Sequence, residues 1–258
     1  IFHLAAVVQH SRRNSEEMLR TNVEGCLSMV RLAAQHACRL VLISTSGTVG
    51  CFSDDSQRPD EDAPYCSSTI ARWPYYVSKR RAEEACRALA DELGVELVII
   101  RPPVLLGPGD HRFRSTRNVL RALQGRLPFV VRGGMHFSDV RDSAQAVFRA
   151  MTCSHPRRVY HLPGTICSIR EFFDMVEALS GVAGPRFVLP PAPARAVASL
   201  CARLGVDWVP DPVVVEMASH HWGTTSLYAR DELDYHARPG KETLADTIEW
   251  LRAHHDAL

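Results

Sequence analysis

The N-terminal part of the chain alternates between short apolar runs and longer amphipathic stretches. The apolar runs occupy residues 1–8, 39–46 and 95–103. Helical spacing of apolar residues marks 15–37 and 78–93, and Gly94 is placed to end the second stretch as a left-handed cap. Continuous rather than alternating apolar strands are typical of a parallel sheet that helices cover on both faces. The pattern therefore predicts a doubly wound α/β fold of the Rossmann type.

The pattern loosens beyond Gly109. Two further helices are expected near 141–152 and 168–180, with short strands between them and a Pro/Ala-rich passage at 188–200. We expect residues 1–109 to form a dinucleotide-binding domain, and 110–258 to form mainly a smaller, mixed substrate-binding domain. Some segments of the second part should pack back on the first.

Composition and charge narrow the class of protein. A hydrophobic content of 46% and a formal net charge of +1 are ordinary for a globular chain, and the low net charge argues against a nucleic-acid-binding surface. No run of about 18 apolar residues predicts a membrane helix. With no recognisable signal peptide, we expect a cytoplasmic protein without a membrane partner. The eight cysteines include no C-x-x-C pair, which favours reduced thiols. Glu216 and His220 lack a well-spaced third ligand, so no metal site is expected.

The sequence "YYVSK" places Tyr75 four residues before Lys79. On a helix, this spacing puts both side chains on one face, one turn apart. Among the 30 lysine and arginine residues, Lys79 and Lys241 are the two lysines. The compact ammonium of lysine and the guanidinium of arginine are not interchangeable where the charge must sit next to another group and shift its pKa. A positive charge near a tyrosine lowers its pKa from about 10 and suits it to acid–base work on a carbonyl or alcohol. A packed tyrosine and a solvated lysine are the alternative interpretation.

Two other polar residues fit the same site. Ser46 ends the apolar run "RLVLISTS", where its hydroxyl can hydrogen-bond a substrate carbonyl, although strand ends often carry a turn serine. Asn22 lies within a helical pattern, where asparagine is mildly unfavourable unless its side chain has a separate role. This position suggests a local distortion of the helix.

The ordered series "HLAA", "NVEG", "STSGTVG", "YYVSK" and "RPPVLLGPGD" resembles the extended short-chain dehydrogenase/reductase family, of the NAD-dependent epimerase/dehydratase type. "HFSDVRD" (136–142), "YHLPG" (160–164) and "ELDYHARPGKETLADTIEWL" (232–251) are similar to its C-terminal half. The closing segment most resembles the dihydroflavonol-reductase-like and 3β-hydroxysteroid-dehydrogenase-like branch.

The resemblance implies roles for particular residues. Tyr75 would be the catalytic acid–base, Lys79 would lower its pKa and hold the nicotinamide ribose, Ser46 would position the substrate oxygen, and Asn22 would support the proton relay. The dinucleotide would be lined by Leu4, Ala5, Ala6, Ser44, Tyr75, Lys79, Pro102, Pro103 and Val104. His111 and Arg112 are weaker candidates for the substrate mouth, which Arg72 and Trp73 could flank. A homodimer through the helices around Asn22 and Tyr75 is also compatible with the resemblance.

The family's first βαβαβ half, with its Gly-rich phosphate-binding turn, has no counterpart here. The nearest candidate, "GTVGCFS" (47–53), is followed by a polar loop instead of a helix and is rejected. The chain also begins at Ile1 inside an apolar run. We therefore expect a fragment that lacks its first strands, exposes 1–8 as an apolar edge, and binds dinucleotide poorly when isolated. The segment that selects NAD or NADP would lie in the missing half.

The expected function is an NAD(P)-dependent oxidoreductase that reduces a ketone or oxidises a secondary alcohol by hydride transfer. Two alternatives remain open at this point. The same Ser46–Tyr75–Lys79 set can serve a nucleotide-sugar epimerase or dehydratase, and a catalytically silent dinucleotide-binding scaffold needs no such set. The expected partner is a small carbonyl or alcohol substrate.

Overall fold

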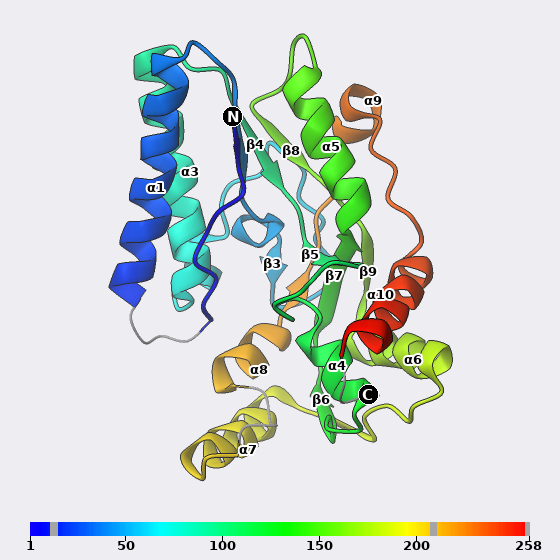
Figure 1. The fold of residues 1–258 in the computed structure, drawn as a ribbon. Helices are drawn as coiled ribbons and strands as arrows, with labels where there is room; N and C mark the ends of the chain where they lie inside the picture. The colour runs from blue at the N-terminus through cyan, green and yellow to red at the C-terminus, as the bar shows by residue number, and fades with distance from the viewer. Residues whose placement is uncertain (11–14, 207–210, 256–258) are drawn as a thin grey trace.

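A four-stranded parallel sheet organises the N-terminal part of the chain (Figure 1). The computed structural model describes residues 1–10, 15–206 and 211–255. The strands, in spatial order, are β1 (Phe2–His3), β2 (Leu40–Ile43), β4 (Leu97–Arg101) and β8 (Val159–His161). Each neighbouring pair is parallel. This sheet confirms the predicted Rossmann-type α/β class, and β8 is a segment from beyond residue 109 that packs back on it.

Alternating side chains of the sheet build two separate cores. Leu97 and Ile99 pack against α1 (Ser15–Gln35) and α3 (Pro74–Leu93), which stand side by side on one face of the sheet (Figure 1). The intervening Val98 points to the opposite face, together with residues of α5 (Val140–Thr152) and α9 (Ala229–Leu233). Because successive strand residues point to opposite faces, a run of apolar residues is what a sheet covered on both sides requires.

The C-terminal half contributes a second, mixed sheet. It contains β5 (Val104–Leu106), β7 (Gly134–Asp139) and β9 (Thr165–Ser168), with β5 parallel and β9 antiparallel to β7. The helices packed with it are α4 (Arg117–Leu123), α6 (Ile169–Ser180) and α10 (Gly240–His254). Smaller elements complete the chain: η1 (Ser46–Thr48), β3 (Cys51–Phe52), α2 (Ser67–Ile70), β6 (Phe129–Val131), β10 (Phe187–Leu189), α7 (Pro191–Arg203), α8 (Pro212–Ala218) and β11 (His221–Trp222). β6 pairs with β10, and β3 pairs with β11.

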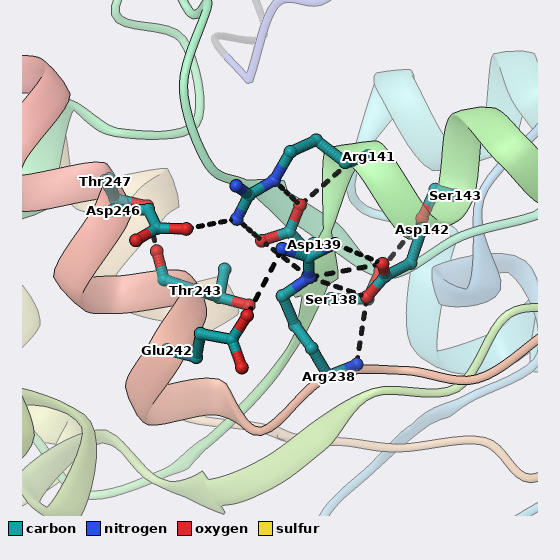
Figure 2. Close-up of polar contacts among 10 residues, drawn as sticks. All are labelled: Ser138, Asp139, Arg141, Asp142, Ser143, Arg238, Glu242, Thr243, Asp246 and Thr247. Carbon is teal, nitrogen blue, oxygen red and sulfur yellow. Dashed lines mark hydrogen bonds and ion pairs between the residues drawn. The ribbon is translucent and has the colours of Figure 1, made fainter.

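An ion-pair network joins the start of α5 to α10 and the segment before it (Figure 2). Asp139 caps α5 by accepting a hydrogen bond from the backbone amide of Arg141. The Arg141 guanidinium lies between Asp139, at 2.7 Å, and Asp246 of α10, at 2.5 Å. Arg238 pairs with Asp142 at 2.7 Å. The motifs "HFSDVRD" and "ELDYHARPGKETLADTIEWL" therefore lie side by side, and their ion pairs link α5 to α10.

Two elements begin or end differently from the sequence prediction. The strand expected over 1–8 is shorter in the structure: it pairs with β2 only at Phe2 and His3, opposite Val41 and Leu42. Within the described residues β1 is an edge strand, and Leu4 beyond it is 65% exposed, in keeping with the expected apolar edge. The helix expected from residue 78 begins at Pro74, since proline is well tolerated in the first helical turn. Gly94 adopts the predicted left-handed cap, with φ of 67°.

A buried histidine in β7 should make stability depend on pH. His136 is 2% exposed, and its Nε2 accepts a hydrogen bond from the Gly164 amide at 3.1 Å, so its proton lies on Nδ1. Burial, followed by the charges of Arg58 and His161, lowers the pKa of His136 to about 3. The unfolded state, with a pKa near 6.5, therefore takes up the proton first as the pH falls. We expect His136 to reduce the free energy of unfolding by about 2 kcal/mol between pH 7 and pH 5.

Urea unfolding at several pH values measures this effect. His136→Gln keeps an acceptor for the Gly164 amide and should flatten the decline, whereas His155→Gln, at an exposed position, should leave it unchanged. An unaltered slope in His136→Gln would show that His136 is not the group that titrates.

Candidate active site

The candidate residues gather where parallel strands of the first sheet end. The Lys79 ammonium, 5% exposed, donates a hydrogen bond of 2.6 Å to the carbonyl of Ile43, the last residue of β2. The amide of Ser44 donates a hydrogen bond to the carbonyl of Ile100 in β4. Two residues further on, the amide of Ser46 donates to the Pro102 carbonyl at 2.9 Å. Lys79, Ser44 and Ser46 therefore lie at the carboxyl edge of β2 and β4, where ligands bind in open parallel sheets.

The turn that carries Ser46 packs directly against the first turn of α3. A Cβ atom on Gly47 would overlap the ring of Tyr76 and lie 2.9 Å from Trp222. Glycine at position 47 thus permits the close approach of η1 to α3. Because Gly47 follows Ser46 and Tyr76 follows Tyr75, this contact brings the backbones that carry Ser46 and Tyr75 together.

Asn22 of α1 forms hydrogen bonds to the segment that follows β1 and to α3. Its Oδ1 accepts from the amide of Val7 at 2.8 Å, and its Nδ2 donates to the Val7 carbonyl at 3.0 Å and to Ser78 Oγ at 2.9 Å. Ser78 Oγ in turn donates to the carbonyl of Tyr75 at 2.7 Å. The helix α1 runs unbroken through Asn22, so the suggested local distortion is wrong: the side chain leaves the helix ladder intact and bonds to a neighbouring segment.

Replacing Asn22 should therefore destabilise the fold at the edge of the site. We expect Asn22→Ala to lower the free energy of unfolding by about 1–3 kcal/mol, because the peptide groups of Val7 and the Ser78 hydroxyl lose buried partners. Chemical denaturation measures the difference. Asn118→Ala, which removes only a 3.5 Å contact with Arg121 on α4, is the matched control and should change little. Equal effects of the two substitutions would contradict the role of Asn22.

The electrostatics of Tyr75 differ from the sequence prediction. Its ring lies edge-on between His10, at 5.7 Å between ring centroids, and Tyr76, at 5.2 Å. Burial raises the pKa of Tyr75 to about 12, and Lys79 does not contribute to the shift. The predicted lowering of the Tyr75 pKa by Lys79 is therefore not what this structure shows. The physical reason is that the Lys79 ammonium faces the Ile43 carbonyl and is itself desolvated, which lowers its own pKa.

The hydroxyls of Ser46 and Tyr75 make no hydrogen bond to any residue that the structure describes. Both belong to side chains that the structure places at strand or helix ends, whereas nearby polar groups such as Ser78 are engaged. A hydroxyl that the protein does not use is free to bond a ligand. A carbonyl or hydroxyl oxygen is one ligand that such hydroxyls can bond.

The residues predicted to line a dinucleotide fall into two groups. Leu4, Ala5, Ala6 and Val104 are exposed beyond the ends of β1 and β4, whereas Ser44, Pro102 and Pro103 are buried beside them. The exposed group can contact a ligand directly. The buried group holds the strand ends together, since the Ser46 amide bonds to the Pro102 carbonyl.

The four residues proposed to line or flank the substrate mouth differ in their contacts and exposure. Arg72 pairs with Glu216 at 3.0 Å, and Trp73 is 1% exposed inside a core cluster, so packing is the structural role of Trp73. His111 lies edge-on to Trp250 of α10 with ring centroids 5.3 Å apart, and Arg112 is exposed. The assignment of His111 and Arg112 to a substrate mouth stays a prediction.

Sequence reasoning missed His10, which contacts the Tyr75 ring. Its Nδ1 is buried and has no hydrogen-bond partner among the described residues. Burial lowers the pKa of His10, and the nearby Asp211 and Arg114 act on it in opposite directions. No motif marks this position, because His10 follows the strand in an irregular segment whose course depends on the Asn22 contacts.

A buried ion pair supports α3 behind the site. Glu83 and Arg101 are 0% and 2% exposed, and the guanidinium Nη2 lies 2.6 Å from the carboxylate. The hydroxyl of Tyr65 also donates to Glu83, at 2.9 Å. Arg101 Nη1 lies 3.3 Å from His161 Nε2, while His161 Nδ1 lies 3.0 Å from the Thr225 carbonyl. Because a carbonyl only accepts, His161 carries its proton on Nδ1 and accepts from Arg101.

The protein groups fit the nicotinamide half of a dinucleotide. Lys79 uses one donor on Ile43 and retains others that can reach ribose hydroxyls, and the apolar, exposed Leu4 can lie against a ring system. In the described residues, η1 leads into β3 and not into a helix, in agreement with the rejection of "GTVGCFS" as a phosphate-binding turn.

Other classes of site find no support in the described ranges. Across 1–10, 15–206 and 211–255, no three His, Cys, Asp or Glu side chains are grouped to hold a metal ion. The eight cysteines are free. No helix in the described part of the chain is both long and apolar enough to cross a membrane.

A Rossmann-type sheet with unpaired hydroxyls and a lysine beside its strand ends has its polar groups where open α/β sheets bind ligands. The model of the "NAD dependent epimerase/dehydratase family" matches residues 1–162, and the chain belongs to this family. NAD is the family's cofactor.

The relatives with curated names include reductases. The chain is 25% identical to a "Putative dihydroflavonol 4-reductase" of Synechocystis over 98% of its own length and 76% of the relative. It is 35% identical to "Dihydroflavonol 4-reductase" of Zea mays, in an alignment that covers 42% of this chain and 32% of that relative. The predicted resemblance to the dihydroflavonol-reductase-like branch is thus confirmed.

Solved structures agree with the fold. The crystal structure of gox2253 superposes with a TM-score of 0.82 at 26% identity, covering 98% of this chain and 78% of the other. MoeE5 in complex with UDP-glucuronic acid and NAD superposes with a TM-score of 0.71 at 25% identity, covering 98% and 78%.

Proposed function

We propose that the protein is an NAD-dependent reductase or dehydrogenase that interconverts a ketone and a secondary alcohol. Three observations support this proposal. The Lys79 ammonium lies against Ile43 at the carboxyl end of β2, and Gly47, next to Ser46, packs against Tyr76, next to Tyr75. The hydroxyls of Ser46 and Tyr75 bond to no residue that the structure describes. The reductases among the relatives support the same reaction class.

Each side chain has a separate task in this proposal. The bound nicotinamide supplies or accepts a hydride. Tyr75, protonated at neutral pH because its pKa is about 12, donates its proton to the substrate oxygen during reduction. Ser46 donates a hydrogen bond to the same oxygen and so orients the carbonyl. Lys79 holds the ribose and, as a cation, stabilises the phenolate that Tyr75 leaves behind.

Asn22 acts as a positioning residue. Through Ser78 it fixes the carbonyl of Tyr75 at the start of α3, and through Val7 it fixes the segment that follows β1. Both contacts keep the catalytic helix and the proposed nicotinamide site at a constant separation.

Epimerisation or dehydration of a nucleotide sugar is the second candidate. It is favoured by the similarity to MoeE5, which binds UDP-glucuronic acid and NAD, and it would use the same three residues. In that reaction the cofactor is regenerated in each cycle, so no net change in its redox state accumulates.

An assay of the full protein separates the two candidates. NADH and NADPH are each supplied with a dihydroflavonol and with other ketones, and, separately, NAD is supplied with UDP-glucuronic acid. We expect net oxidation of the reduced cofactor with a ketone. Conversion of the sugar nucleotide without net cofactor turnover would favour the second candidate and contradict the first.

A further inference from the structure

The helix α7 has an unusual distribution of apolar side chains. Its packed face consists of small residues, with Ala194 and Ala198 at 0% and 1% exposure against β6 and α8. Its large apolar residues point outward: Val197, Leu200 and Leu204 at its end are 40%, 58% and 70% exposed. A surface helix of a globular protein normally does the reverse and buries its largest apolar residues.

These outward residues form one stripe. Positions 197, 200 and 204 are spaced i, i+3 and i+7, so they follow each other along one side of the helix. The preceding strand β10 exposes Phe187 and Val188, at 64% and 41%. We call Phe187, Val188, Val197, Leu200 and Leu204 the α7 patch. In Figure 1, α7 lies at the bottom of the view, at the end of the molecule away from the N-terminus.

The charged residues of the segment that carries β10 and α7 are arginines. Residues 185–206 contain Arg186, Arg195 and Arg203, all exposed, and no Asp or Glu. The exposed Arg126 and Arg132 flank β6, the strand that pairs with β10. Near the start of α8, the carboxylate of Asp211 is used to cap that helix. Within the described residues, exposed apolar side chains of the patch therefore have exposed arginines beside them.

We propose that the α7 patch docks the protein onto an anionic phospholipid bilayer, with α7 lying in the plane of the interface. Apolar residues on one side of a helix with basic residues beside them bind acyl chains and anionic headgroups together. At 13 residues, α7 is too short to span a bilayer, which takes about 20. A second copy of the chain fits this surface less well, because it would bring the same arginines together.

Vesicle co-sedimentation tests the proposal. The wild-type protein is mixed at low salt with vesicles of phosphatidylcholine, with and without phosphatidylglycerol. We expect binding to the anionic vesicles and roughly tenfold weaker binding after Leu200→Ser and Leu204→Ser are combined. The pair Arg195→Gln and Arg203→Gln should weaken binding by about tenfold or more, and added salt should weaken the wild type in the same direction.

Matched variants separate this patch from exposed residues elsewhere. Phe148→Ser on α5, where the side chain is 61% exposed, and Arg31→Gln on α1, also exposed, should bind like the wild type. Because all the substituted side chains are exposed, their thermal unfolding should match that of the wild type. Wild-type protein that stays in the supernatant with anionic vesicles overturns the proposal. So does equal binding by the patch variants, or a change from dimer to monomer on their substitution, which would assign the surface to self-association.

Discussion

Tyr75→Phe is expected to lower kcat by about 10²- to 10⁴-fold, the usual contribution of a positioned general acid. Phenylalanine keeps the ring that packs against His10 and Tyr76 and removes only the hydroxyl. Because that hydroxyl bonds to no residue that the structure describes, the melting temperature should stay within the error of the wild type. Steady-state kinetics with a saturating ketone and reduced cofactor, together with a thermal melt, measure both quantities.

The adjacent tyrosine provides the control. Tyr76 lies in the same turn of α3, but its ring is stacked on Trp222 at 5.1 Å and closes over η1. Tyr76→Phe should therefore leave kcat nearly unchanged. If Tyr75→Phe retained near-normal turnover, or if both variants lost it equally, the assignment of the proton to Tyr75 would be wrong.

Glu83→Gln is expected to have the largest effect on stability. The Arg101 guanidinium would keep its charge inside the protein, 2% exposed, with an uncharged amide in place of its carboxylate partner. Removing one member of a buried ion pair costs about 3–5 kcal/mol. Since Glu83 lies one helical turn after Lys79, a looser α3 should also raise KM for the cofactor. Urea unfolding and cofactor kinetics measure the two effects.

The neighbouring Glu84 provides a control, because its ion pair is partly exposed whereas that of Glu83 is buried. Glu84 pairs with Arg80 at 2.7 Å on the partly exposed side of the same helix. Glu84→Gln should cost less than about 0.5 kcal/mol, because such i, i+4 pairs are screened by water. Similar losses of stability in the two variants would mean that burial does not set the strength of the Glu83–Arg101 pair.

The apolar runs predicted the first sheet well because burial on both faces demands them. They failed at β1, where Leu4 is apolar but has no strand partner in the described residues. The Pro/Ala-rich passage gave no clear element, yet it forms α7, since Pro191 stands at the first helical position, where its missing amide hydrogen costs nothing. Strand pairing and helix starts depend on neighbours that composition does not specify.

Residue identity and spacing indicated the chemistry of the site, but its electrostatics could not be foreseen. The spacing of Tyr75 and Lys79 predicted a shared helix face. It could not show that burial raises the Tyr75 pKa, or that the Lys79 ammonium lies against Ile43. The sequence does not reveal the role of His10 either, because its contact with Tyr75 depends on the path that the chain takes after β1. Solvation and long-range contacts are tertiary properties.

The most direct test of the central claim is isotope transfer in the full protein. The reduced cofactor carries deuterium in place of both hydrogens at the carbon that gives up the hydride, a ketone substrate is added, and the product is analysed by mass spectrometry. Direct hydride transfer predicts one deuterium in the product alcohol for each cofactor oxidised. Product that forms without label, or without matching oxidation of the cofactor, would contradict it.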